Sequence, residues 1–147
     1  LNVKLKYLDQ FNAARKAAAD YYDKAFSECP FIITPARSRY SSHIFHQYTI
    51  KIRNGKRDEL KKHLELARIP AMIYYPGPLH LQKAYNFLGY DKDSFPVTTE
   101  LCKQVLSLPM HPDLEQDQLN YITSSVLKFF EKNDNGKRIL CTRDRSH

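Results

Sequence analysis

The pattern of hydrophobic and polar positions predicts one long amphipathic helix near each end of the chain. Over residues 1–28, apolar side chains recur at the i, i+4, i+7 spacing of a helix face. That face consists of Leu1, Leu5, Leu8, Phe11, Ala14, Ala18, Tyr21 and Ala25. Over residues 114–132, the inward face consists of Leu119, Ile122, Val126, Phe129 and Phe130. No capping residue precedes the first helix, so we expect the chain to be a piece of a longer protein.

Between these helices the pattern changes from strand to helix several times. Residues 43–53, HIFHQYTIKIR, alternate strictly and predict a strand. One face holds Ile44, His46, Tyr48, Ile50 and Ile52, and the other holds Phe45, Gln47, Thr49, Lys51 and Arg53. Further strands are predicted at 71–75 and 105–108, with a short extended segment at 29–34. Helices are predicted at 57–67 and 94–104.

This order of elements favours an α/β class of the α+β kind, with a small, largely antiparallel sheet of three or four strands packed with helices. The expected organisation is a leading helix at 1–28, a small domain at 29–132 and a tail at 133–147. The 147 residues suffice for one domain with its own core.

Composition changes this picture little. At 42% hydrophobic and 27% charged residues, the chain has the profile of a globular protein, and no apolar run approaches the ~20 residues of a membrane helix. Three scattered cysteines without a CxxC pair indicate reduced thiols and a cytoplasmic location. The net charge of +7 favours anionic partners.

Several classes of site are disfavoured by spacing. His43 and His46 are three residues apart on the predicted strand, so we expect them on opposite faces and predict no metal site. The four glycines stand alone, which excludes a P-loop or a dinucleotide fingerprint. No cysteine or serine stands in a nucleophile signature.

A basic stretch at residues 51–62 leaves nucleic-acid binding open as an alternative. It carries Lys51, Arg53, Lys56, Arg57, Lys61 and Lys62, with Tyr48 and Phe45 nearby. A solvated basic helix explains the same residues more simply, so nucleic acid is not the preferred partner. A plain protein-interaction module with an exposed apolar face is the third hypothesis.

The stretch IYYPGPLH, residues 73–80, contains the strongest candidate binding residues. Pro76, Gly77 and Pro78 end the strand and fix a rigid corner. We expect Tyr74 and Tyr75 to point to opposite sides, so that one packs and the other is offered to a ligand. A tyrosine there can stack on a base or sugar and also form a hydrogen bond.

Several stretches together resemble the C-terminal part of the DegT/StrS-type, pyridoxal-phosphate-dependent nucleotide-sugar aminotransferases. They are LNVKLKYLDQFNAARKAAADYY, HIFHQYTIKI, RDELKKHLELARIPAMIYYPGPLHLQKAY, FPVTTELCKQVLSLPMHPDL and QLNYITSSVLKFF. In order and spacing they cover residues 1 to about 130.

The resemblance implies the small C-terminal domain of a fold-type I aminotransferase. In such enzymes a large N-terminal domain makes most of the contacts with pyridoxal phosphate and carries the lysine that binds this cofactor. The implied reaction moves an amino group from glutamate to a keto group on a nucleotide-linked sugar, in the biosynthesis of amino sugars and polysaccharides. The intact protein is then expected to be a homodimer, and this chain to carry no catalytic residue and to be inactive alone.

Individual positions follow the family unevenly. Tyr75 matches the tyrosine of the family's His-Tyr-Pro segment near the nucleotide-sugar, whereas Tyr74 stands where a histidine is usual. His80 matches the histidine after the second proline and implies a role in the site wall. Arg68 replaces a glycine usual at a helix end, and Glu115 replaces a threonine that caps a helix. The substrate-binding candidates are therefore Tyr75, Tyr74 and His80.

Overall fold

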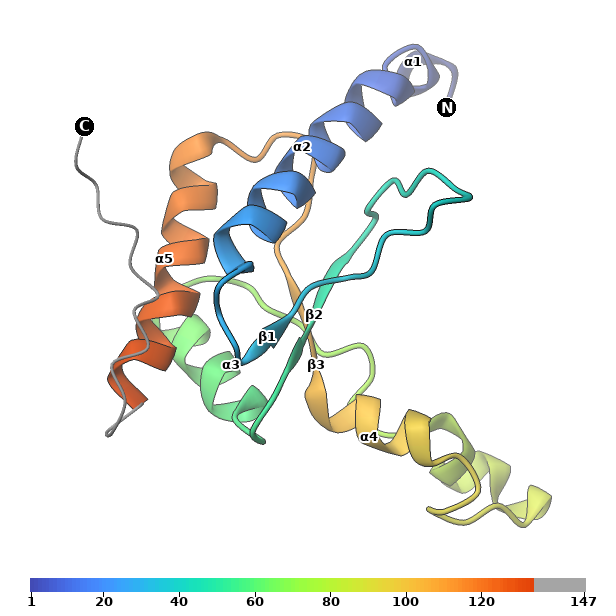
Figure 1. Cartoon of the computed structure of the whole chain (residues 1–147). Helices are drawn as coiled ribbons and strands as arrows, with labels where there is room; N and C mark the ends of the chain where they lie inside the picture. The colour runs from blue at the N-terminus through green and yellow to red at the C-terminus, as the bar shows by residue number, and fades with distance from the viewer. Residues whose placement is uncertain (134–147) are drawn as a thin grey trace.

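A three-stranded antiparallel sheet with helices packed on it forms the body of the computed structural model, which describes residues 1–133 (Figure 1). The expected tail beyond residue 133 lies outside the described residues. The strand order is β1–β2–β3, so the longest strand is central. The strands are β1 (Ile32–Ile33), β2 (Tyr48–Ile52) and β3 (Val105–Leu108). The helices are α1 (Asn2–Leu5), α2 (Leu8–Phe26), α3 (Arg57–Leu66), α4 (Pro96–Gln104) and α5 (Gln116–Asn133), with the 3₁₀ turns η1 (Leu79–Leu81) and η2 (Lys83–Leu88).

The core lies between one face of the sheet and the helices α2, α3 and α5. Along β2 every second side chain is buried, namely Tyr48, Ile50 and Ile52, as alternation requires. The inward stripe predicted for α5 is confirmed, because its five apolar residues are all buried. Leu60 and Leu64 of α3 are likewise buried. The α+β class and the small antiparallel sheet are therefore confirmed.

The first helix differs from the prediction in two ways. The helical stretch is interrupted between Leu5 and Leu8, and Tyr7 has non-helical angles of φ −108° and ψ 5°. Leu1 and Leu5 are exposed, so the predicted apolar stripe has nothing to pack against at that end. The buried part of α2 begins only at Ala18, where the helix crosses the core.

The predicted strand over residues 43–53 is half as long as expected. Pairing begins at Tyr48, and Phe45 has a positive φ of 50°. This backbone angle takes Phe45 into the core, where it is 1% exposed, while Ile44 is exposed. Burial of the larger aromatic side chain therefore overrides the local alternation.

Residues 71–75 do not form the predicted fourth strand. Met72 alone pairs with Ser107 at the free edge of β3, through backbone hydrogen bonds of 3.0 and 2.7 Å. Pro76 cannot donate to a ladder, and the chain leaves the sheet there. Beyond this point, η1, η2 and α4 project from the body at the lower right of Figure 1, and none of them has a buried residue. We call residues 74–104 the arm.

Arg68 and Glu115, which depart from the family's usual residues, each lie at the end of a helix. Arg68 has a φ of 56°, the left-handed angle that favours glycine. Its N–H donates to the carbonyl of Glu65, and the N–H of Ile69 donates to that of Leu64, which completes a Schellman motif at the end of α3. At the start of α5, the Glu115 N–H donates to Gln118 Oε1 at 3.0 Å. Half of a capping box thus replaces the capping threonine.

Candidate functional site

The corner at residues 73–80 is fixed to the sheet at one end and open at the other. Ile73 packs against the core immediately after the Met72 bridge. Pro78 is extended, and its carbonyl accepts the Leu81 N–H, which closes the first turn of η1. The corner is thus a rigid step from the body into the arm.

Tyr74 and Tyr75 lie together rather than on opposite sides. Their ring centroids are 5.8 Å apart with an edge-to-face angle of 69°. Tyr75 is 71% exposed and Tyr74 is 39% exposed. The prediction of opposite sides is wrong because residues 71–75 are not an extended strand. The two rings instead form one aromatic step, with Tyr75 the more accessible.

His80 is held by the base of the arm. Its ring lies 4.9 Å from that of Phe95, and Tyr90 packs edge-to-face on Phe95 at 5.1 Å. His80 Nε2 is out of solvent and has no hydrogen-bond partner among residues 1–133. A buried polar atom without a hydrogen-bond partner is energetically costly. The ring of His80 packs on Phe95 and not on Tyr74 or Tyr75.

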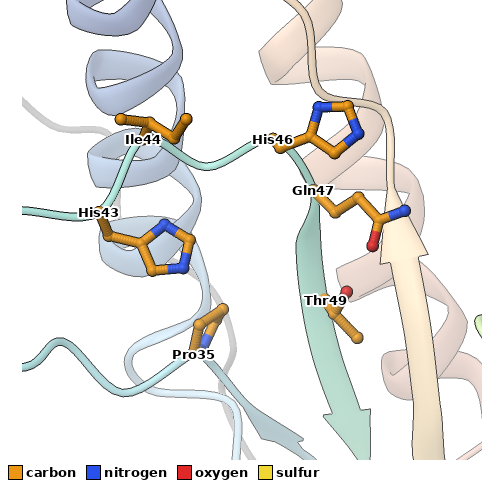
Figure 2. Close-up of a pocket in the computed structure, with 6 residues that line it drawn as sticks. All are labelled: Pro35, His43, Ile44, His46, Gln47 and Thr49. Atoms are coloured by element: carbon orange, nitrogen blue, oxygen red, sulfur yellow. The ribbon is translucent and has the colours of Figure 1, made fainter.

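A second polar region, which the sequence did not indicate, lies at the other end of β2. It is a pocket between the loop before β2 and the strand itself, and Figure 2 shows the residues that line it. Its volume is about 350 Å³. It is lined by Pro35, His43, Ile44, His46, Gln47 and Thr49. His43 and His46 line the same pocket, so the expectation of opposite faces is wrong. The cause is the positive φ of Phe45, which interrupts the alternation between them.

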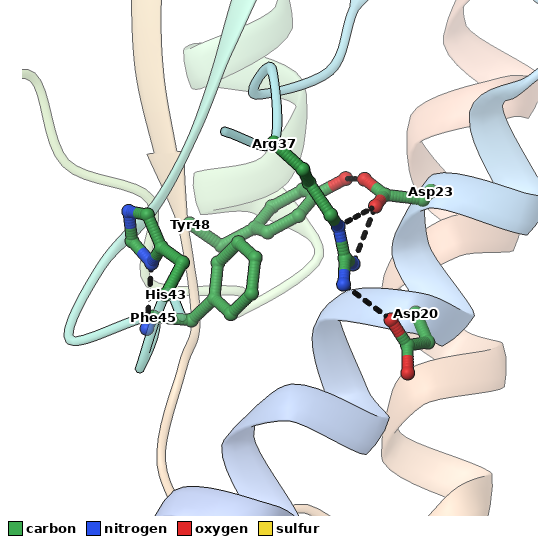
Figure 3. A network of polar contacts seen from close by, with 6 residues as sticks. All are labelled: Asp20, Asp23, Arg37, His43, Phe45 and Tyr48. Carbon is green, nitrogen blue, oxygen red and sulfur yellow. Dashed lines mark hydrogen bonds and ion pairs between the residues drawn. The ribbon is translucent and has the colours of Figure 1, made fainter. Parts of the chain in front are cut away.

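A network of charged and aromatic side chains holds this loop against α2 (Figure 3). Arg37 donates to Asp23 through Nε at 2.9 Å and forms an ion pair with Asp20 at 2.6 Å. The same guanidinium lies 4.7 Å from the ring centroid of Phe45. Tyr48 donates its hydroxyl hydrogen to the second oxygen of Asp23 at 2.5 Å. Burial, and then this hydrogen bond to Asp23, raise the pKa of Tyr48 above its ordinary value.

Arg57 and Lys61 of the basic stretch at 51–62 are engaged within the chain itself. Arg57 is buried, and it donates to the carbonyls of Cys102 and Val105. Lys61 pairs with Glu65. Tyr48 and Phe45 are in the core and therefore offer no stacking face.

Neither a metal site nor a cradle for pyridoxal phosphate is formed by these residues. Within residues 1–133, no three His, Cys, Asp or Glu side chains gather as metal ligands would. No lysine in that part of the chain is buried or lines the pocket. The residues present therefore do not fit the cofactor. None of the described helices has the length and apolarity needed to cross a bilayer.

Comparison with known proteins connects this geometry to one group of enzymes. The chain is 38% identical over 132 residues to a pleiotropic regulatory protein of Geobacillus stearothermophilus, covering 88% of the chain and 35% of that protein. It is 33% identical over 134 residues to the dTDP-3-amino-3,4,6-trideoxy-alpha-D-glucose transaminase of Streptomyces venezuelae, covering 91% and 35%.

Similarity in structure agrees with similarity in sequence. The crystal structure of DesV from S. venezuelae matches with a TM-score of 0.83 and 32% identity, over 88% of this chain and 34% of that one. The match is to the C-terminal part of a fold-type I aminotransferase. The chain thus spans about a third of the length of these relatives. Residues 1–127 match the sequence model of the DegT/DnrJ/EryC1/StrS aminotransferase family, and the chain belongs to that family.

Proposed function

We propose that this chain is the C-terminal part of a pyridoxal-phosphate-dependent aminotransferase that acts on a nucleotide-linked keto sugar. Glutamate is the proposed amino donor, and the product is an amino sugar for a polysaccharide or related glycan. The family match over residues 1–127 carries this proposal. It is supported by relatives whose names specify transamination of nucleotide-linked sugars.

Within this chain, the corner is the proposed contact with the nucleotide-sugar. Tyr75 offers an exposed ring on a rigid step, and Tyr74 supports it edge-to-face. Such a ring can stack on a base or sugar while its hydroxyl forms a hydrogen bond. His80, held against Phe95, is the proposed wall residue, and its buried Nε2 has no hydrogen-bond partner among the described residues.

The cofactor is proposed to be bound by parts of the protein outside this chain. DegT/StrS aminotransferases depend on pyridoxal phosphate, which supplies an electron sink for amino-group transfer. The residues described here do not form a cradle for it, so the 147-residue chain by itself is proposed to be inactive. Its thiols, scattered along the sequence, fit the expected cytoplasmic location.

The proposed partner of the arm is a second copy of the protein. The arm exposes large apolar side chains in one continuous segment, among them Leu79, Phe87 and Val97. Exposed apolar surface of this extent is typical of an interface. A homodimer would cover the arm and bring the corner close to the site of the other subunit.

A chimera tests the proposed function directly. Residues 1–127 of this chain would replace the matching part of the S. venezuelae transaminase, and amino transfer from glutamate to its keto sugar nucleotide would be measured. We expect measurable transfer by the chimera. The same part of that enzyme deleted without replacement is the control and should give none. A folded, cofactor-loaded chimera without transfer would contradict the proposal.

The isolated chain provides the complementary test. After incubation with pyridoxal phosphate and reduction with borohydride, we expect no single lysine to carry the cofactor stoichiometrically. One specifically modified lysine, together with amino transfer, would overturn the view that the cofactor site lies outside this chain.

A further inference from the structure

The pocket between the 35–47 loop and β2 shares no lining residue with the corner, and the function proposed above assigns it no role. We propose that it binds the neutral, hydroxylated ring of a hexose. The inference rests on the proposed function only in naming the sugar of a nucleotide-sugar as the natural source of that ring. The inference itself depends on the chemistry of the lining.

The lining carries no permanently charged side chain. The six residues include no Lys, Arg, Asp or Glu. A phosphate or carboxylate would find none of the Lys or Arg side chains that usually bind such anions among these six residues. Sugar hydroxyls both donate and accept, and so do the imidazole, amide and hydroxyl groups of His43, His46, Gln47 and Thr49. Pro35 and Ile44 add apolar surface against which the C–H groups of a sugar ring can pack.

The hydrogen-bonding state of His43 is defined by the backbone. Its Nδ1 accepts the N–H of Phe45 at 2.9 Å. In the neutral ring, the proton must then be on Nε2, which leaves one defined donor for a ligand hydroxyl. The side chains of His46 and Gln47 form no hydrogen bond with any of the described residues, so both are available to a ligand.

Thr49 adds a hydroxyl from the strand itself. Its Oγ1 lies 2.7 Å from Oγ of Ser107, a buried residue of β3. One hydroxyl hydrogen lies between the two oxygens. When Ser107 donates, the hydrogen of Thr49 remains available to a ligand in the pocket.

The pocket is formed before any ligand arrives. Arg37 joins the loop to Asp20 and Asp23 of α2, and the buried ring of Phe45 lies under the guanidinium (Figure 3). A preformed loop lowers the entropy cost of binding. The volume of about 350 Å³ is at the lower end of the range for small-molecule sites, roughly 300–1,000 Å³, and therefore suits one ring rather than a whole nucleotide-sugar.

Histidine NMR of the 147-residue chain tests this inference. The Cε1–Hε1 signals would be followed during titration with methyl α-D-glucopyranoside and, separately, with inorganic phosphate. We expect the glucoside to shift the signals of His43 and His46 with a dissociation constant on the order of 1–10 mM, as expected for a ligand of this size. His63 and His111, which do not line the pocket, should not move.

Two variants make the test specific. Gln47→Leu removes an exposed amide from the lining and should weaken binding about tenfold, whereas Gln82→Leu removes an exposed amide on the arm and should leave binding unchanged. Larger shifts with phosphate than with glucoside, no shift by 100 mM glucoside, or insensitivity to Gln47→Leu would each overturn the proposal. Because amino transfer is not measured, failure here leaves the chimera result unaffected, and the reverse also holds.

Discussion

The phenol of Tyr48 and the carboxylate of Asp23 join the centre of the sheet to α2 through a hydrogen bond of 2.5 Å. Tyr48 is fully buried, and its ring lies 4.8 Å from that of Tyr22 at a tilt of 36°; Tyr22 lies on the same helix as Asp23. Tyr22 in turn donates to the carbonyl of Pro109 at 2.9 Å. The two tyrosines therefore bring α2, β2 and the end of β3 together through groups that must stay protonated.

This arrangement predicts loss of stability in alkali. Burial raises the pKa of Tyr22, and burial together with the hydrogen bond to Asp23 raises the pKa of Tyr48. The folded state thus holds both protons more tightly than the unfolded chain, whose tyrosines ionise near pH ~10. Their stabilising effect is complete below that pH and is lost as the pH rises above it. The free energy of unfolding should fall by about 1.4 kcal/mol per pH unit for each of these tyrosines, measured by urea denaturation between pH 9 and 11.5.

The Tyr48→Phe variant is the control for this pH dependence. It removes one titrating group, so its free energy of unfolding should fall less steeply above pH 10. At pH 7 it should be less stable by about 2 kcal/mol, because a hydrogen bond to a charged group is lost from the core. Equal slopes for the two proteins would show that Tyr48 does not carry the effect.

The second prediction concerns the guanidinium that fastens the loop. Arg37→Met keeps much of the aliphatic length but removes the ion pairs with Asp20 and Asp23 and the contact with Phe45. The Arg37 side chain is partly exposed, so we expect a loss of only about 1 kcal/mol in the free energy of unfolding. Amide hydrogen exchange in residues 36–47 should become faster than in α5.

A matched variant separates the local effect from a general one. Lys103→Met removes an exposed cation that pairs with Glu100 on α4. It should change neither stability nor exchange in residues 36–47. If Arg37→Met left exchange there unchanged as well, the loop would be held by the burial of Phe45 alone.

The elements that could be predicted are those whose signals are local. The strand at 105–108 is bounded by Pro109, and the apolar face of α5 repeats at helical spacing from Leu119 to Phe130. Tertiary contacts determine the elements that the local pattern predicts wrongly. Phe45 leaves the alternating pattern because the core accommodates its ring, and residues 71–75 pair only at Met72 because Pro76 directs the chain away from the edge of β3.

The corner at residues 73–80 and the pocket before β2 also differ in how far the sequence predicts them. An exposed tyrosine at a proline-bounded corner is readable in the sequence, but the pattern there does not tell which of Tyr74 and Tyr75 is the more exposed. The pocket does not follow from the sequence, because it depends on contacts between Arg37 and Asp23, 14 residues apart, and on the left-handed backbone at Phe45. Neither feature has a local sequence signature, so His43 and His46 could not be placed together beforehand.

The third prediction concerns the end of α3. Arg68 occupies the left-handed position of the Schellman motif, where a β-carbon is unfavourable. Arg68→Gly should therefore raise the free energy of unfolding by about 0.5–1 kcal/mol. Arg68→Ala keeps the β-carbon and should bring no gain. Thermal unfolding of the three proteins distinguishes strain in the backbone from an effect of the arginine charge, because loss of the charge is common to both variants.

The last prediction tests the corner in the chimera with the S. venezuelae transaminase. Tyr75→Ala removes the exposed ring of the aromatic step and should raise KM for the sugar nucleotide about tenfold, the effect of losing one stacked base or sugar. Tyr75→Phe keeps the ring and should stay within about threefold of the parent if stacking dominates. Tyr40→Ala, which removes an exposed tyrosine outside the arm, is the control and should leave KM unchanged. If Tyr75→Ala lowered kcat without raising KM, the tyrosine would act on the chemical step rather than on binding, because an interaction formed only in the transition state leaves KM unaffected.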